Sequence, residues 1–220
     1  TLTALPLFVW MGEILFRTKL SENLFKGLSP WMQKLPGGLI HVNVVGCALF
    51  AAISGSSAAT VATVGKMSIP ELRKRNYPEK ILLGSLAGSG TLGLLIPPSI
   101  ILIIYGVAVQ ESIAKLFIAG IIPGIMIALI FMSYVIIWSL INKKEMPKIL
   151  EEYSFLEKIK RSKQLLPVIL LISAVIGSIY TGVATATEAA SLGVVGALIL
   201  SYFQKSLTLE TFKSSLLGAT

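Results

Sequence analysis

The most constraining feature of this sequence is a hydrophobic segment, residues 81–109, that is long enough to cross a membrane but is interrupted at its centre. Three glycines and two prolines lie where a spanning helix should be most regular: Gly88, Gly90, Gly93, Pro97 and Pro98. Lipid offers no partner to the backbone groups that such a break releases, so the break must face protein or a water-filled cavity. Half-helix ends at that depth favour the binding of ions and small anions, which indicates transport.

The composition indicates an integral membrane protein. Hydrophobic residues make up 54% of the chain, charged residues 14%, and the mean hydropathy is +0.81, so we expect an all-α polytopic protein in a lipid bilayer. The net charge of +8 would suggest nucleic acid in a soluble protein, but these cations lie between apolar runs and indicate membrane topology, with no nucleic-acid partner. The single cysteine, Cys47, is expected to be a small core residue.

Six apolar stretches approach or exceed the roughly 20 residues of a membrane-spanning helix. They are residues 2–16, 39–65, 81–109, 116–141, 165–180 and 188–203. The chain begins inside one apolar run and ends partway into what resembles another segment, so we expect a piece of a longer polytopic protein.

Lysine and arginine are distributed unevenly among the connecting segments. Segments 17–38, 66–80 and 142–164 hold four, five and seven of them, whereas 110–115 holds one and 181–187 holds none. The positive-inside rule therefore places the three rich segments, and the start of the tail after residue 203, in the cytoplasm. The two poor segments lie outside.

Stretch 39–65 conflicts with this assignment if it crosses the membrane once, because the basic segments on its two sides would then lie on opposite faces. Its 27 residues exceed one span, and its centre is small and polar. A re-entrant hairpin resolves the conflict: residues 39–53 enter, 54–57 turn and 58–65 return. The alternative is a tilted single span, which breaks the charge rule. The later stretches then alternate across the membrane.

Residues 20–34 are amphipathic and predict a helix along the cytoplasmic interface, with a plain loop as the alternative. Its apolar side carries Leu20, Leu24, Phe25, Leu28 and Trp31. The Lys/Glu-rich residues 149–163 predict a solvated loop helix.

The predicted hairpin tip, Ser54-Gly55-Ser56-Ser57, forms one half of a candidate site. Its hydroxyl and carbonyl oxygens suit an alkali cation, and the helix that starts after it presents N–H groups to an anion. The alternative is close helix packing by small residues.

The interrupted segment forms the other half. Residues 81–87 are expected to end as a half-helix whose free carbonyls suit Na⁺, and a second half-helix is expected to begin at Ser99 after the two prolines. The N-terminal end of that second half-helix suits a carboxylate. The alternative is an ordinary span with two kinks.

Three other polar residues lie in or beside apolar stretches. Glu188 either completes an N-terminal cap with Thr185 or Thr187 or belongs to an ion pathway. Glu13 is expected to pair with a cation of a partner or to approach the interface, and His41 is expected to be a packing or interface residue. No metalloprotease motif, Asp pair or phosphate loop occurs in the sequence, so we do not expect an enzyme.

Four segments in this order resemble the large membrane subunit of tripartite ATP-independent periplasmic (TRAP) transporters. They read FAAISGSSAATVATVG (50–65), AGSGTLGLLIPPSIILIIYG (87–106), AGIIPG (119–124) and YTGVATATEAASLG (180–193). The combination of SGSSA and LGLLIPPS at this spacing is specific, and the resemblance runs through nearly the whole chain.

The resemblance implies an elevator-type fold built from inverted repeats, in the cytoplasmic (inner) membrane of a bacterium or archaeon. It divides the chain into a scaffold helix and interfacial arm (1–38), half of a transport domain (39–109), a transmembrane helix (116–141), a cytoplasmic loop (142–164) and the start of a second repeat (165–220). It further implies Na⁺-coupled import of an organic acid, with a periplasmic substrate-binding protein and a small membrane subunit as partners. C4-dicarboxylates, sialic acids and other organic acids all fit, and no cofactor besides the coupling ion is implied.

These considerations assign two sets of site residues. The Na⁺ set is Ser54, Gly55, Ser56, Gly88, Thr91 and Gly93. The substrate set is Ser56, Ser57, Pro97, Pro98 and Ser99. Two alternatives remain open: an elevator-type Na⁺/anion transporter that works without a binding protein, and a non-transporting membrane assembly subunit.

Overall fold

The computed structural model describes residues 3–17, 20–147 and 153–219, and every regular element in these ranges is helical. The α-helices are α1 (Ala4–Phe16), α2 (Leu20–Met32), α3 (His41–Ser54), α4 (Ser57–Lys74), α5 (Glu79–Gly90), α6 (Ile100–Ala108), α7 (Ile113–Ile141), α8 (Phe155–Ser162), α9 (Leu166–Tyr180), α10 (Ala186–Phe203) and α11 (Leu209–Gly218). Short 3₁₀ helices lie at Gly38–Ile40 (η1), Thr91–Leu94 (η2) and Lys143–Glu145 (η3). The all-α prediction is confirmed.

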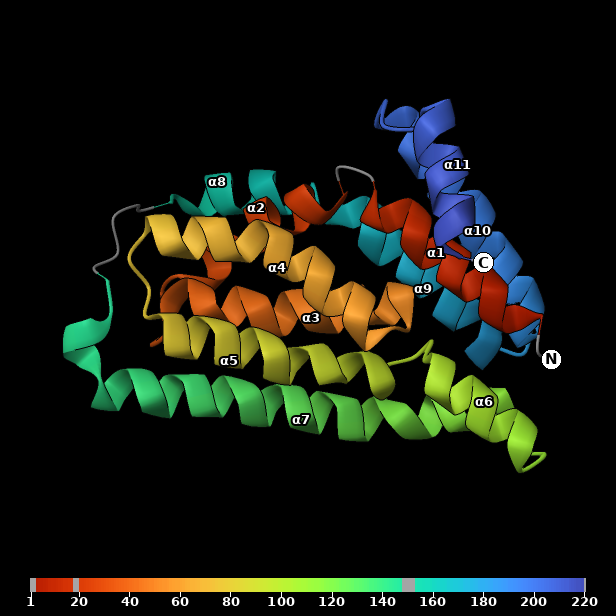
Figure 1. The fold of residues 1–220 in the computed structure, drawn as a ribbon, viewed down its shortest axis with the longest axis horizontal. Helices are drawn as coiled ribbons and strands as arrows, with labels where there is room; N and C mark the ends of the chain where they lie inside the picture. The colour runs from red at the N-terminus through yellow and green to blue at the C-terminus, as the bar shows by residue number, and fades with distance from the viewer. Residues whose placement is uncertain (1–2, 18–19, 148–152, 220) are drawn as a thin grey trace.

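Four helices, α3, α4, α5 and α7, lie lengthwise beside one another (Figure 1). The connection between α4 and α5 and the C-terminal end of α7 lie at one end of this group, and the connection between α6 and α7 lies at the other (Figure 1). The two basic segments that flank these helices, 66–80 and the described part of 142–164, are therefore at the same end. This arrangement agrees with the topology that the charge distribution predicts.

Stretch 39–65 folds as two antiparallel helices, α3 and α4, which pack on each other. The turn lies at Gly55 and Ser56, within the predicted range 54–57. The predicted end of the returning helix at residue 65 is wrong, because α4 continues to Lys74. Hydropathy falls after residue 65, but one side of the helix still packs inside the protein: Ser68 and Leu72 are fully buried.

Segment 81–109 is divided as predicted, but at a later residue. The first half, α5, does not end at residue 87; it continues to Gly90 and passes into the 3₁₀ turn η2. A glycine costs a helix only about 1 kcal/mol, and packing overrides that cost. The helical path is lost at residues 95–99, which contain the cis peptide Pro97–Pro98, and α6 begins after Ser99 as predicted.

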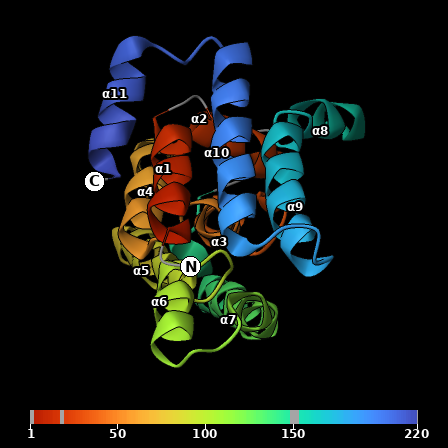
Figure 2. The same ribbon diagram turned by 90° about the vertical axis from the view of Figure 1, so that its right-hand side faces the viewer.

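A second group consists of α1, α9 and α10, which lie side by side in Figure 2, with α11 returning along α1. Figure 1 shows this group running obliquely to the first. Phe8 of α1 meets Phe117 of α7 edge to face, at 6.4 Å between ring centroids, and both rings are buried. The core is thus continuous between the two groups.

The predicted interfacial helix is α2, and its apolar side packs against protein. Leu24, Phe25 and Leu28 are buried, and α2 contacts α3 and α8; the side chain of Leu20 lies outside the described residues. The apolar side of α2 is therefore buried against other helices of the chain. Its location at the membrane interface stays a prediction. The helix predicted within 149–163 is α8, although residues 149–152 lie outside the described part.

Among the residues that the structure describes, two helices are long and apolar enough to cross a membrane, α7 and α10, and the bent pair α8–α9, with 53° between its halves, would supply a third. These spans, together with the apolar helices α1 and α3, are compatible with the predicted membrane protein.

Candidate functional site

The hairpin tip is built by one glycine and a serine cap. Gly55 has a left-handed backbone (φ +59°) and ends α3 by donating its N–H to the carbonyl of Ala51 at 3.0 Å. Ser56 is extended and caps α4, its hydroxyl accepting from the N–H of Ala59 at 3.4 Å. The local sequence therefore turns the chain within two residues.

A buried hydroxyl pair closes the tip from the inside. Ser54 Oγ lies 3.0 Å from Thr60 Oγ1, and Thr60 Oγ1 donates to the Ser56 carbonyl at 2.7 Å. Ser54 Oγ also accepts from the N–H of Ser56 at 3.3 Å. Ser54 and Thr60 are both buried, so their hydrogen-bonding capacity is used mainly to hold the turn.

The break in segment 81–109 is stabilised by its own hydroxyl groups. Ser99 is buried; its hydroxyl donates to the Leu94 carbonyl at 2.7 Å and accepts from the N–H of Leu102 at 3.5 Å. Thr91 is exposed, and its hydroxyl donates to the Gly88 carbonyl at 2.7 Å. The Gly88 carbonyl, a member of the predicted Na⁺ set, therefore already accepts a hydrogen bond.

The two halves of the predicted site lie against each other. The N–H of Ile100 donates to the Gly55 carbonyl at 3.3 Å. A Cβ on Gly55 would lie 2.5 Å from the Pro98 carbonyl oxygen, and one on Gly93 would lie 2.9 Å from the Ser57 nitrogen. Only glycine permits this approach of backbone to backbone.

The structure therefore brings together most, but not all, of the residues predicted for the site. The hairpin tip meets Gly93 and the Pro98–Ser99 end of the break, and Pro97 is buried beside Pro98. Gly88 instead faces α7, where a Cβ would lie 3.3 Å from the ring of Phe131, and the hydroxyl of exposed Thr91 bonds only to Gly88 among the described residues.

The predicted ligand sets left out two buried hydroxyls in these segments, Ser89 and Thr60. Ser89 is fully buried, and its hydroxyl, like that of Ser57, has no hydrogen-bond partner within the described residues. The signal for Ser89 was its place between Gly88 and Gly90, and the signal for Thr60 was its position one turn after Ser56. A buried hydroxyl without a hydrogen-bond partner is costly, so the hydroxyls of Ser57 and Ser89 are available to bind a ligand.

The motif AGIIPG on α7 packs against the break in segment 81–109. Gly120 and Gly124 are one turn apart; a Cβ on Gly120 would lie 2.6 Å from the Leu95 carbonyl oxygen, and one on Gly124 would lie 2.9 Å from Ile96 Cγ1. At 1.5 Å per residue, the break thus lies about 10–16 Å from the Ile113 end of α7 and about 26–32 Å from its Ile141 end. Non-helical backbone is therefore packed within the length of an apolar spanning helix.

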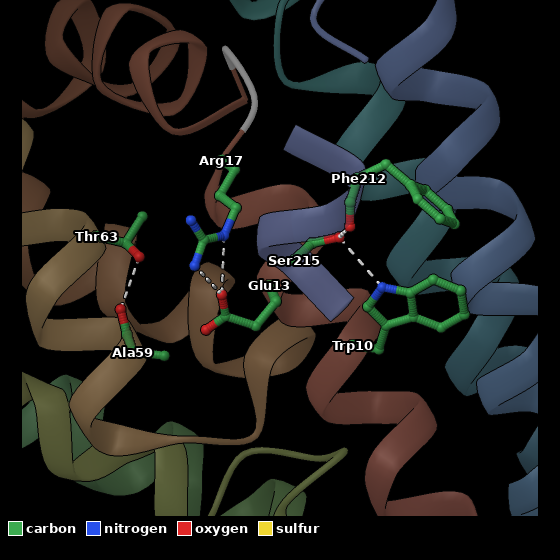
Figure 3. A network of polar contacts seen from close by, with 7 residues as sticks. All are labelled: Trp10, Glu13, Arg17, Ala59, Thr63, Phe212 and Ser215. Atoms are coloured by element: carbon green, nitrogen blue, oxygen red, sulfur yellow. Dashed lines mark hydrogen bonds and ion pairs between the residues drawn. The ribbon is translucent and has the colours of Figure 1, made fainter. Parts of the chain in front are cut away.

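The two acidic residues singled out from the sequence, Glu13 and Glu188, lie elsewhere and have structural partners. Glu13 pairs with Arg17, the residue that follows α1, at 3.0 Å, beside α4 and α11 (Figure 3), so its cation is supplied within the chain. Glu188 and Thr185 form a capping box at the start of α10: the Thr185 N–H donates to Glu188 Oε2 at 2.8 Å. This geometry supports the capping alternative, with Thr185 rather than Thr187 as the cap.

His41 and Cys47 are buried, as expected of packing residues. His41 Nε2 lies 2.8 Å from the Pro36 carbonyl oxygen. No group of three or more His, Cys, Asp or Glu side chains able to hold a metal occurs among the described residues. The ligands that the tip and the break offer are neutral oxygens, which suit a monovalent alkali cation better than a transition metal.

Comparison with known proteins gives a consistent result. The family model described as "Tripartite ATP-independent periplasmic transporter, DctM component" matches residues 1–220. The C4-dicarboxylate TRAP transporter large permease protein DctM of Pseudomonas aeruginosa is 36% identical over 92% of this chain and 47% of its own length. The ectoine/5-hydroxyectoine permease UehC of Ruegeria pomeroyi is 35% identical (91% and 46%), and the sialic acid permease SiaM of Vibrio cholerae is 36% identical (96% and 49%).

The chain spans about half the length of these curated relatives. They are transporter permease proteins and not enzymes, in agreement with the prediction that this chain is not an enzyme.

Proposed function

The chain belongs to the family of the DctM component of tripartite ATP-independent periplasmic (TRAP) transporters, and from this premise we propose that it forms part of the membrane pathway of a secondary transporter that imports an organic acid together with Na⁺. The relatives are named for C4-dicarboxylates, ectoines and sialic acid. These compounds share a carboxylate, so we propose a carboxylate-bearing substrate.

One observation carries the proposal: the hairpin tip and the broken segment meet, through the bond from the Ile100 N–H to the Gly55 carbonyl, at a level inside the length of α7. Irregular backbone at membrane depth is costly unless it lines a binding site or is buried in protein. The same arrangement is the physical signature of ion and anion sites in secondary transporters.

We propose that the cation is held by neutral oxygens at this junction. The free hydroxyls of Ser57 and Ser89 join the predicted set around Ser54, Gly55, Ser56 and Gly93, whereas Gly88 and Thr91 are weaker members because they bond to each other. A bound Na⁺ would offset the charge of an incoming carboxylate and so couple the two bindings.

The carboxylate is proposed to lie near the starts of α4 and α6. Ser56 caps one helix, Ser99 caps the other, and the two starts are adjacent across the Gly55–Ile100 bond. Two positive helix ends that converge favour an anion more than either end alone. Pro97 and Pro98 fix the backbone on one side of this space.

The rest of the mechanism is proposed from the family. The unit made of α3–α6 would slide against a scaffold that includes α1 and α2, in the bacterial or archaeal cytoplasmic membrane. A periplasmic binding protein would deliver the substrate, and a small membrane subunit would complete the transporter.

The test is Na⁺-driven uptake by the complete transporter in proteoliposomes. Ser57→Ala and Ser89→Ala should each raise the Na⁺ concentration for half-maximal uptake about tenfold, because each removes an oxygen from a charged ligand. Ser99→Ala should raise the substrate KM instead. Ser133→Ala is the matched control, since Ser133 is exposed on α7 and bonds only to Leu129 of its own helix within the described chain.

An unchanged Na⁺ dependence in both Ser57→Ala and Ser89→Ala, with folded protein, would reject these cation ligands. Uptake without added binding protein would favour the alternative transporter class. Intolerance of bulky residues at Gly93 does not exclude an assembly subunit, because the Ser56–Ser57 backbone leaves no space there whatever the function. Uptake by the reconstituted protein distinguishes a transporter from an assembly subunit.

A further inference from the structure

A groove of about 300 Å³ lies between α5 and α7, away from the site described above. It is lined by Gly84, Ser85, Ile130, Phe131, Tyr134 and Val135. Ile130 and Tyr134 are 55% and 58% exposed, so the groove opens on the outer side of α7. A Cβ added at Gly84 would meet nothing within 4 Å. This glycine therefore leaves open space in the groove and does not serve a close contact between helices.

The Ser85 hydroxyl on the floor of the groove is already hydrogen-bonded within the protein. The Ser85 hydroxyl donates to the Leu82 carbonyl at 3.0 Å and accepts from Asn43 Nδ2 at 3.0 Å. The remaining lining is apolar apart from the exposed Tyr134 side chain. A carboxylate would find no partner on this floor, and the fitting occupant is a hydrocarbon chain.

Cations lie at the end of the groove that the charge distribution places in the cytoplasm. Lys80 precedes Gly84 by one turn of α5 and therefore lies on the same side of that helix. Lys143 and Lys144 follow the end of α7, nine and ten residues after Tyr134. All three are exposed and none pairs with a carboxylate in the described part of the chain.

We propose that this groove is a binding site for an anionic phospholipid of the cytoplasmic leaflet, with one acyl chain between α5 and α7 and the headgroup phosphate near Lys80, Lys143 and Lys144. An apolar slot alone would accept any hydrocarbon. The cations at its cytoplasmic end make the fit specific for a negatively charged headgroup. The groove also continues into the exposed apolar side of α7, which is where lipid would reach it.

The test is native mass spectrometry of the complete purified transporter, titrated with phosphatidylglycerol and, separately, with phosphatidylcholine. We expect phosphatidylglycerol to bind at least fivefold more tightly. Lys80→Gln should weaken phosphatidylglycerol about fivefold, the usual effect of one juxtamembrane cation, and leave phosphatidylcholine unchanged. Gly84→Leu should fill the groove and remove this binding step.

The chain offers matched controls for both changes. Gly177→Leu, on α9, also adds a side chain where a Cβ would meet nothing within 4 Å. Lys115→Gln removes an exposed cation near the opposite end of α7. Neither control should alter phosphatidylglycerol binding.

Unchanged binding in Gly84→Leu would overturn the proposal, and so would equal affinity for the two lipids. A third contrary result is a Gly84→Leu protein that binds no lipid because its subunits no longer assemble, since the groove would then be covered by protein. The measurement does not depend on transport, so its failure is separable from failure of the proposed function.

Discussion

At the scale of single residues, glycine decides where the two halves of the site can meet. Gly55 and Gly93 each face backbone atoms of the other half, whereas Gly84 and Gly177 face open space. The sequence shows these four glycines as equivalent, and only the fold separates them. Contacts with backbone are the least forgiving, because a backbone atom cannot rotate away as a side chain can.

Gly93→Ala should therefore destabilise the protein by about 1–3 kcal/mol, since its Cβ would lie 2.9–3.1 Å from atoms of Ser56 and Ser57. Gly177→Ala, inside α9 and unobstructed, should be neutral or stabilising by up to about 1 kcal/mol. Thermal unfolding of the purified proteins compares them. Equal melting temperatures would mean that the tip and the break are not in contact.

Glu188 is the residue for which a structural and a functional role are most easily confused. Glutamine can replace glutamate in a capping box, so Glu188→Gln should keep both the fold and Na⁺-driven uptake. Thr185→Ala should cost about 0.5–2 kcal/mol of stability, and Thr187→Ala much less. Loss of uptake in a stable Glu188→Gln protein would instead place this carboxylate in an ion pathway.

At the scale of helices, hydropathy located the elements and misplaced several of their ends. Each apolar stretch corresponds to a helix or a pair of helices, and the two interruptions were found because Gly55 and the Pro97–Pro98 pair act through backbone geometry, which is local. The end of α4 at Lys74 was missed because helical hydrogen bonds continue wherever one side stays buried, even in a polar sequence.

The site was predictable only in part, for a related reason. The residues of the tip and the break were identified from their types and spacing, but the burial of the Ser89 hydroxyl depends on which side of α5 faces α4. The orientation of α5 is set by contacts distant in sequence, such as Gly90 against Val61.

Two peripheral helices are each fastened by one tryptophan. Trp31 Nε1 donates to Ser162 Oγ of α8 at 2.7 Å and its ring meets Phe155 edge to face. Trp10 Nε1 donates to Ser215 Oγ of α11 at 3.2 Å, beside Phe212 (Figure 3). These contacts connect α2 with α8 and α1 with α11.

Trp31→Ala should therefore speed amide hydrogen exchange in α8 and leave α11 unchanged, and Trp10→Ala should do the reverse. Each variant is the control for the other. A rise across both helices in either variant would mean that the two tryptophans support the whole fold rather than one helix each.

At the scale of the whole molecule, the decisive question is whether α3 and α4 enter and leave the membrane on one side. In the structure their outer ends, at His41 and Lys74, lie at the same end of the first helix group, beside the C-terminal end of α7 (Figure 1). The charge distribution requires the same arrangement, because basic segments precede α3 and follow α4.

Cysteine labelling tests this arrangement in intact cells, in a Cys47→Ser background that removes the one native, buried thiol. Lys34→Cys and Lys74→Cys, both at exposed positions, should react with an impermeant maleimide only after the membrane is opened, whereas Gln110→Cys should react at once. A single crossing by residues 39–65 would separate Lys34 from Lys74. Opposite labelling of these two positions would therefore exclude the re-entrant hairpin. Identical labelling, with Gln110 on the other side, would exclude the tilted single span, because an even number of passages must then lie between residues 34 and 74.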